Sequence, residues 1–189
     1  MKHLPTLLIV ILILIPGCAY WSSISPKYVS ESRNFEASFP KGWKRDHRIS
    51  KALLGTKDGI KLQYIHIARY GLDDDLPFTK RKLTKDMVTQ EVADIAIDNL
   101  RSAPERIGLE VLENSPDSLC GLPGFRILAK WKSIEGLPER DLLYGLMIDD
   151  KYYEILYEAP SRYYFGRDSA EAVGVVRSFT LIDQKHKGK

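Results

Sequence analysis

The order of apolar and polar residues along the chain predicts a domain that is rich in β-strands. Between Phe35 and Phe39, apolar and polar residues alternate, which is the pattern of a strand with one buried face. The same alternation is stronger from Phe125 to Lys132. Residues 60–69 are apolar at both phases of the alternation, which predicts a strand covered on both sides. Further strands are predicted at 51–55, 109–113, 142–148 and 152–159, the last two joined at Asp149-Asp150 as a hairpin.

Two segments carry helical spacing instead. In the clearer one, apolar residues form a stripe between Val92 and Leu100, with Thr89 as the expected N-cap. A second helix is expected to begin at residue 168 or 169 and to end at Arg177, and residues 179–182 form a closing strand. Because strands outnumber helices and several are linked as hairpins, the pattern favours an α+β fold with a central antiparallel sheet.

The amino-terminal segment has the parts of a secretory signal peptide, predicted over residues 1–17. A positive charge at Lys2 precedes an apolar run from Leu4 to Ile15, and Gly17 is the small residue before the expected cut. This run is shorter than the about 20 residues that a membrane-spanning helix needs.

The end of this segment, Ile15-Pro16-Gly17-Cys18, resembles the lipobox of bacterial lipoproteins. The resemblance implies that the thiol of Cys18 carries diacylglycerol, that the leader is cut before it, and that the new amino terminus receives a further acyl chain such as palmitate. Ala19 stands where Asp would signal retention in the inner membrane, which favours the outer membrane. An ordinary signal peptide or an uncleaved anchor, with a cysteine there by chance, is the alternative.

The segment after the leader predicts a division into tether, domain and tail. Residues 18–33 are rich in serine and lack periodicity, which indicates a lipidated cysteine followed by a flexible tether, with Tyr20 and Trp21 near the membrane interface. The domain is expected over residues 34–182, and residues 183–189 form a basic tail.

Charge and cysteine content narrow the classes of partner. The chain has 28 basic and 25 acidic residues, and loss of Lys2 with the leader leaves a net charge of +2, which is too small to indicate nucleic-acid binding. If Cys18 carries lipid, Cys120 has no partner within the chain and is interpreted as a small buried residue.

The sequence contains none of the common catalytic motifs, so no catalytic residue, cofactor or metal site is predicted. Two alternatives to this interpretation are a metal site at His47 beside Asp46 and a calcium site at Asp73-Asp74-Asp75. Neither has the ligand spacing of a known site, and a solvated loop is the simpler interpretation of the three aspartates. His66 lies in a predicted strand and is interpreted as packed or hydrogen-bonded.

An aromatic region near the carboxyl end supplies the candidate partner surface. Strand alternation places Tyr153 and Tyr157 on one face, and Tyr163 and Tyr164 follow closely in the sequence. Most of these rings are expected in the core, and those on an outer face are the candidate partner-binding residues, because tyrosine combines apolar area with a polar tip.

The order of these elements resembles the PsbP-like fold, whose bacterial members include DcrB-like lipoproteins. The resemblance covers about residues 34–182, and its motifs are Phe39-Pro40-Lys41-Gly42-Trp43, the helix at 89–100, Gly121-Leu122-Pro123-Gly124-Phe125, the run from Tyr152-Tyr153 to Ala159-Pro160, and Ser178-Phe179. It implies a central antiparallel sheet with helices packed on both faces, an α/β/α sandwich. It also implies a non-enzymatic assembly, binding or accessory role without catalytic residues.

Three functions therefore stay open. The first is a lipid-anchored binding or assembly module in the cell envelope, facing the periplasm and acting on an envelope protein. The second is an envelope enzyme whose site, with His47 or His66 and carboxylates, is assembled only in three dimensions. The third is a carrier of a lipid or small ligand in a cavity between sheet and helix.

The anchor makes a direct prediction. Acyl labelling should mark the wild-type protein and not the Cys18→Ser variant, because the thiol is the acceptor of the diacylglycerol group. Labelling is measured in whole cells with a clickable fatty acid, and equal labelling of the two proteins would refute lipidation at Cys18.

Overall fold

The computed structural model describes residues 20–24 and 26–182 of the 189-residue chain. The predictions for the signal peptide at 1–17, for Cys18 and for the basic tail at 183–189 therefore lie outside the described residues. Within the described ranges, no helix is both long enough and apolar enough to cross a membrane.

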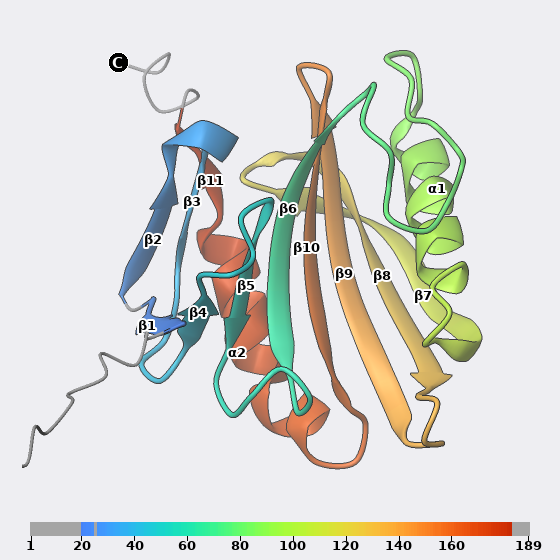
Figure 1. Cartoon of the computed structure of the whole chain (residues 1–189). Coiled ribbons are helices and arrows are strands. Elements are labelled where there is room, and N and C mark those ends of the chain that lie inside the picture. Colours follow the sequence, from blue (N-terminus) through green and yellow to red (C-terminus); the bar gives the residue numbers. More distant parts are fainter. Residues whose placement is uncertain (1–19, 25, 183–189) are drawn as a thin grey trace, which may run out of the picture.

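Antiparallel pairing organises the whole domain (Figure 1). In the described residues, one sheet has eight strands in the order β1-β4-β5-β6-β10-β9-β8-β7 and a smaller sheet has the order β11-β3-β2. The large sheet consists of β1 (Trp21–Ser23), β4 (Lys44–Asp46), β5 (Ala52–Thr56), β6 (Tyr64–Gly71), β10 (Lys151–Pro160), β9 (Pro138–Ile148), β8 (Leu122–Lys132) and β7 (Ile107–Leu119). The small sheet consists of β11 (Thr180–Leu181), β3 (Phe35–Ser38) and β2 (Lys27–Ser30), and a short 3-10 helix covers Glu31–Arg33. The two α-helices are α1 (Thr89–Arg101) and α2 (Tyr164–Ser178).

Two tight turns set the register of the long hairpins. Asp149 and Asp150 join β9 to β10 with φ angles of 47° and 60°, and Cys120 and Gly121 join β7 to β8 with φ angles of 48° and 79°. Two consecutive left-handed residues form the turn whose twist matches that of paired strands. The predicted hairpin at Asp149-Asp150 is thus confirmed, whereas the predicted turn at 120–124 is shorter, because Leu122 already belongs to β8.

Two apolar cores lie on opposite sides of the large sheet. Along β10, Tyr153 and Tyr157 join the core that contains α2, while Tyr152 and Leu156 join the core that contains α1. Neighbouring residues of a strand point to opposite faces, so one strand supplies both cores. α1 contacts β7, β8 and β9 and lies at the right of Figure 1, so the same face of β5 and β6 is left to loops.

The predicted α+β class and central antiparallel sheet are confirmed. The expected α/β/α sandwich is too simple a description, because the domain is richer in strands than predicted and a second sheet shares the side of α2. β7 was predicted only at 109–113 and is longer, since its residues are largely polar and give little periodicity.

The prediction of a tether over residues 18–33 is wrong for the part that the structure describes. Trp21–Ser23 pairs with β4, and Lys27–Ser30 pairs with β3. Between them Ile24 is 4% exposed and its backbone N–H donates to the carbonyl of Trp43 over 3.1 Å. Strands of three or four residues are too short to show an alternation of apolar and polar residues. The many serines in this segment therefore led to the prediction of a flexible tether.

Both helices begin earlier than predicted. Val88, and not Thr89, precedes the first turn of α1, where its backbone N–H donates to the carboxylate of Glu91 over 2.9 Å. α2 begins at Tyr164, and Asp168 is a buried residue within it, where it accepts a hydrogen bond from Gln63 over 2.9 Å.

The burial of Ile24 gives a test of where the domain begins. Ile24→Ala should lower the free energy of unfolding by about 2–4 kcal/mol, because it leaves a cavity between the edge strands and the core. Val29→Ala is the matched control, since Val29 is 50% exposed on β2 and its loss should change stability by less than about 0.5 kcal/mol. Urea unfolding measures the stability of both variants. If Ile24→Ala lowers the free energy of unfolding as little as the control does, residues 20–24 are not part of the folded domain and the prediction of a flexible tether is supported.

Candidate functional site

A groove lies over β5, β6 and β10, on the sheet face that also carries α1. Its floor is built by alternate residues that the strand register places side by side. Leu54 of β5 pairs with His66 of β6, and His66 pairs with Leu156 of β10. In the same way Tyr64 of β6 lies beside Glu158 of β10. Apolar and ionisable side chains therefore alternate along one face.

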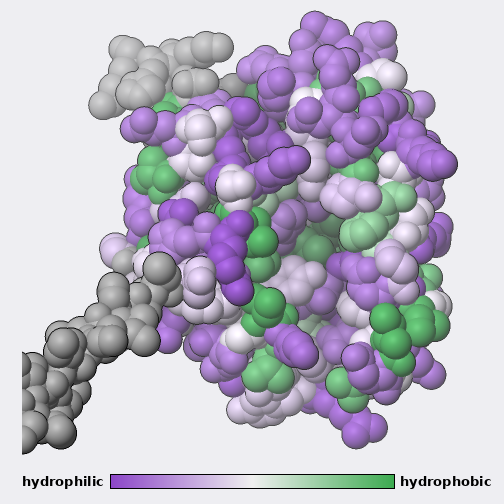
Figure 2. Space-filling model, in the orientation of Figure 1, coloured by the Kyte–Doolittle hydropathy of each residue, from purple (hydrophilic) through white to green (hydrophobic). Residues whose placement is uncertain are grey.

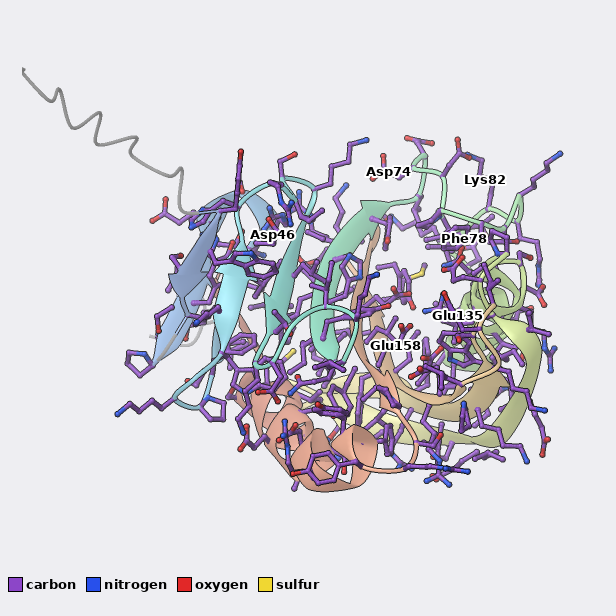
Figure 3. The ribbon with its side chains drawn as sticks, turned by 60° about the horizontal axis from the view of Figure 1, so that its bottom comes forward. Asp46, Asp74, Phe78, Lys82, Glu135 and Glu158 are labelled. Carbon is purple, nitrogen blue, oxygen red and sulfur yellow. The ribbon has the colours of Figure 1, made fainter. Side chains whose placement is uncertain are left out.

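The walls of this groove come from loops and from the end of α1. The cavity has a volume of about 370 Å³, and Figure 2 shows the front face of the molecule hollowed near its centre. Figure 3 labels Phe78 and Glu158, which lie on the same, concave side of the curved sheet next to α1. The apolar lining consists of Ile49, Leu54, Ile60, Pro77, Phe78, Leu100 and Leu156.

A buried arginine holds the centre of the polar part. The Nε of Arg106 donates to Asp141 over 3.0 Å, and its Nη2 donates to Glu158 over 2.6 Å. Tyr64 donates its hydroxyl to the same Glu158 oxygen over 2.6 Å, and Trp131 donates its indole N–H to Asp141 over 2.9 Å. The guanidinium also lies 5.2 Å from the centre of the Trp131 ring. Charge-assisted bonds of this kind fix both carboxylates in place.

Negative groups outnumber positive ones in this network. Asp141 is 0% exposed, and Glu154 and Glu158 line the same face, against the single guanidinium of Arg106. Burial, and after it the charge of Asp141, raise the pKa of Glu158 to about 8, while Arg106 opposes this rise. Burial also raises the pKa of Asp141, against the opposing charge of Arg106. One cation therefore does not suffice to keep all three carboxyl groups ionised at neutral pH.

Glu154 and His66 form the second polar group of the groove. Glu154 accepts a hydrogen bond from Tyr152 over 3.0 Å, and its other oxygen lies 4.0 Å from the Nδ1 of His66. Burial raises the pKa of Glu154 to about 7, and burial together with the charge of Arg106 lowers the pKa of His66 to about 4. The imidazole is therefore neutral at physiological pH, and the carboxyl group is poised to gain or lose a proton there.

The polar network also borders a second hollow of about 270 Å³. Tyr64, Trp131 and Glu158 line it together with Glu135 and Glu139. Burial raises the pKa of Glu139 to about 7, with further contributions from the charges of Asp141 and Glu135. The groove and this hollow thus flank one cluster of carboxyl groups, and the arrangement suits a ligand with an apolar part and a basic or hydrogen-bond-donating part.

The structure divides the four tyrosines that were predicted to bind a partner. Tyr153 and Tyr157 are 2% and 1% exposed in the core beneath α2, where most of these rings were expected, and so they do not offer a surface to a partner. Tyr163 is 61% exposed, and Tyr164 is half-buried beside it at the start of α2. Arg167 lies over both of the latter rings, 5.2 and 4.9 Å from their centres. Neither Tyr163 nor Tyr164 lines the groove.

The candidate metal ligands are engaged with other groups of the protein. His47 is hydrogen-bonded to Ser22 over 2.7 Å, while Asp46 accepts bonds from Arg48. In the aspartate loop, Asp74 accepts the backbone N–H of Gly71 over 2.6 Å. Across residues 20–24 and 26–182, no group of three or more His, Cys, Asp or Glu side chains is arranged to hold a metal ion. Cys120 is half-buried, and burial raises the pKa of its thiol.

The groove residues were missed from the sequence, although a signal for some of them was present. Glu154 and Glu158 lie in step with Tyr152 and Leu156, at positions that alternation assigns to a buried face. Acidic residues at buried positions of a strand indicate a site or a buried ion pair. Arg106 gave no such signal, because it lies in the loop after α1 and reaches the site only in the folded chain.

Comparison with solved structures supports the PsbP-like fold. The cyanobacterial PsbP protein CyanoP from Synechocystis sp. PCC 6803 has a TM-score of 0.58 and 12% identity, with 88% of this chain and 95% of that chain covered. The Ran-binding protein Mog1p of Saccharomyces cerevisiae has a TM-score of 0.56 and 11% identity, with 84% and 96% covered. LpqN, described as involved in cell envelope biogenesis of Mycobacterium tuberculosis, has a TM-score of 0.54 and 13% identity, with 78% and 82% covered. Identities this low show the fold alone. No protein-family model and no curated protein sequence matches the chain.

The raised carboxyl pKa values predict that the protein becomes less stable as pH rises. An unfolded glutamate has a pKa of about 4.3, so between about pH 6.5 and 8.5 the folded protein releases protons that the unfolded chain has already lost. The free energy of unfolding should therefore fall over this window by about 2 kcal/mol. The lowered pKa of His66 changes the free energy of unfolding only below about pH 6.5, where an unfolded histidine takes up a proton. It therefore does not hide the decrease expected above that pH.

Urea unfolding at several pH values measures this effect. Glu154→Gln should reduce the fall by about 1 kcal/mol, because one of the titrating groups is removed. Glu31→Gln is the control, since Glu31 is exposed on the 3-10 helix, and it should leave the pH profile unchanged. A profile that is flat in the wild type would contradict the assigned protonation of the groove.

Proposed function

We propose that the protein is a lipid-anchored, non-enzymatic component of the cell envelope that binds an envelope protein partner in the groove over β6 and β10. The observation that carries this proposal is a hollow with apolar walls that is lined by Glu154 and Arg106, where Arg106 already pairs with two further carboxyl groups, those of Asp141 and Glu158. The similarity in fold to LpqN, whose description names envelope biogenesis, is in keeping with an accessory role. The lipobox-like Cys18 supplies the anchor and places the domain on the periplasmic side, with the outer membrane favoured.

The charge imbalance indicates the chemistry of the partner. Burying a carboxylate without a counter-ion costs free energy, and the raised pKa values of Glu158, about 8, and Glu154, about 7, limit this cost because both groups hold a proton for part or most of the time at neutral pH. A lysine or arginine side chain entering the groove would replace such a proton and restore the ion pairing. Apolar groups next to that cation would contact Phe78, Leu54 and Leu156.

An envelope enzyme is the second candidate, and one specific observation favours it. His66 and Glu154 meet inside a cavity, as a site assembled in three dimensions requires, with 4.0 Å between their nearest nitrogen and oxygen. His47 takes no part, because it lies against Ser22. The pKa of His66, lowered to about 4, keeps its imidazole neutral at physiological pH, and at 4.0 Å the pair forms no hydrogen bond, which favours binding as the first candidate.

Site-directed photocrosslinking in intact cells tests the proposed site. A benzophenone amino acid at Phe78, which is 43% exposed at the groove, should give one discrete adduct with an envelope protein. The same amino acid at Val29, which is 50% exposed on β2, should not give that adduct. Glu154→Gln should weaken the Phe78 adduct by about tenfold, because the partner's cation loses its counter-ion.

The other outcomes separate the competing functions. If the photocrosslinking amino acid gives identical adducts at positions 78 and 29, the groove is not the binding site. An adduct of small mass, seen by intact-protein mass spectrometry, would favour a carrier of a small ligand. If a purified substrate were turned over by the wild type and not by His66→Gln or Glu154→Gln, the non-enzymatic assignment would be wrong.

A further inference from the structure

The edge of the large sheet that contains β1 lies next to the proposed anchor in sequence. Ala19 alone separates Cys18 from Tyr20, where the described part of the chain begins. The carbonyl of Tyr20 accepts the backbone N–H of His47 over 2.9 Å, and Trp21 pairs with Asp46 in β4. Two extended residues reach only about 7 Å. A cysteine held by its lipid at the bilayer surface would therefore keep β1 and β4 within about a Debye length of the headgroups.

Positive and negative residues are unevenly distributed between the part of the chain near this edge and the rest of the domain. Residues 20–51 contain seven Lys and Arg against three Asp and Glu, whereas residues 52–182 contain seventeen against twenty-one. The first range forms the short strands β1 to β4 at the left of Figure 1. The second range contains both α-helices and the long strands. The part of the molecule nearest the anchor is thus positive, and the remainder is negative.

The side chains of this edge are of the kinds that bind a lipid surface. Tyr20 is 53% exposed and Trp21 is half-buried, and the guanidinium of Arg48 lies 5.2 and 5.9 Å from the centres of their rings. Tyrosine and tryptophan are favoured at the membrane interface. Lys44 and Lys51, on β4 and just before β5, are exposed and form no ion pair within the described residues. Such lysines are attracted to anionic headgroups.

We propose that this edge, made of Tyr20, Trp21, Lys44, Arg48 and Lys51, docks on the anionic phospholipid surface beside the anchor and fixes the orientation of the domain. The inference rests on the lipid anchor of the proposed function. The domain then sits on the membrane along its β1 edge, whereas a flexible tether would let it rotate freely. The acidic part of the molecule points away from the bilayer, where anionic headgroups do not repel it.

Quenching of tryptophan fluorescence by brominated lipids tests this orientation. The acylated full-length mature protein is reconstituted in phosphatidylcholine vesicles with or without phosphatidylglycerol, and brominated phosphatidylcholine is the quencher. Trp43 and Trp131 are buried in the domain, at 0% and 6% exposure, so quenching should come from Trp21 and should disappear in Trp21→Phe. Quenching should be stronger with phosphatidylglycerol and should fall at high salt.

Charge reversal supplies the matched comparison. Lys44→Glu with Lys51→Glu should lower the ratio of docked to undocked protein by about fivefold or more for each lysine. Lys80→Glu with Lys132→Glu makes the same change in net charge at exposed positions outside this edge, and it should leave the quenching unchanged.

The results separate a failure of docking from a failure of the anchor. Vesicle flotation shows first whether the protein is anchored. A protein that floats, but whose quenching does not respond to phosphatidylglycerol or to the Lys44 and Lys51 changes, refutes docking and leaves the anchor intact. An equal loss of quenching in both double variants also refutes this edge as the docking surface. A protein that does not float refutes the anchor and, with it, the docked orientation.

Discussion

The antiparallel register of β6, β10 and β9 is the constraint on which the rest of the structure depends. Because successive residues of β10 point to opposite faces, Tyr153 and Tyr157 complete the core under α2, while Glu154 reaches the groove and Glu158 the adjoining hollow. A shift of one residue would place the two glutamates in the apolar core and the tyrosines in the groove. The left-handed turn at Asp149 and Asp150 fixes this register for β9 and β10 together. The fold and the site therefore share one structural cause.

Arg106 makes the charged face of this sheet compatible with folding. It joins Asp141 of β9 to Glu158 of β10 while its guanidinium lies over Trp131 of β8, so one side chain connects three strands. A buried ion pair contributes little net stability when its desolvation is included, but loss of one partner leaves an uncompensated charge. The desolvation of these charged groups costs free energy that apolar packing would not cost. The network lies between two hollows, and we therefore propose that it serves to bind a partner.

The sequence predicted the parts of the fold that have long, regular patterns. The strands around Phe35, Phe125 and Tyr152 and the helix after Thr89 were found because their apolar faces repeat over several turns or pleats. β1 and β2 were missed because three or four residues cannot show a period. The groove was missed because its members come from β5, β6, β10, the end of α1 and several loops, and their proximity depends on sheet order. Sheet order is set by packing between distant segments, which no local pattern encodes.

The loop between β4 and β5 connects the edge that is proposed to face the membrane to the groove. Within it, Arg48 lies over the rings of Tyr20 and Trp21, and the next residue, Ile49, forms part of the groove wall. A domain held along β1 would therefore present the groove at a fixed angle to the bilayer. A partner that is itself bound to the membrane diffuses in two dimensions and meets such a site at a high effective concentration. If Cys18 carries the proposed lipid, only two residues separate the anchor from the first strand, which favours a fixed position near the membrane over long reach.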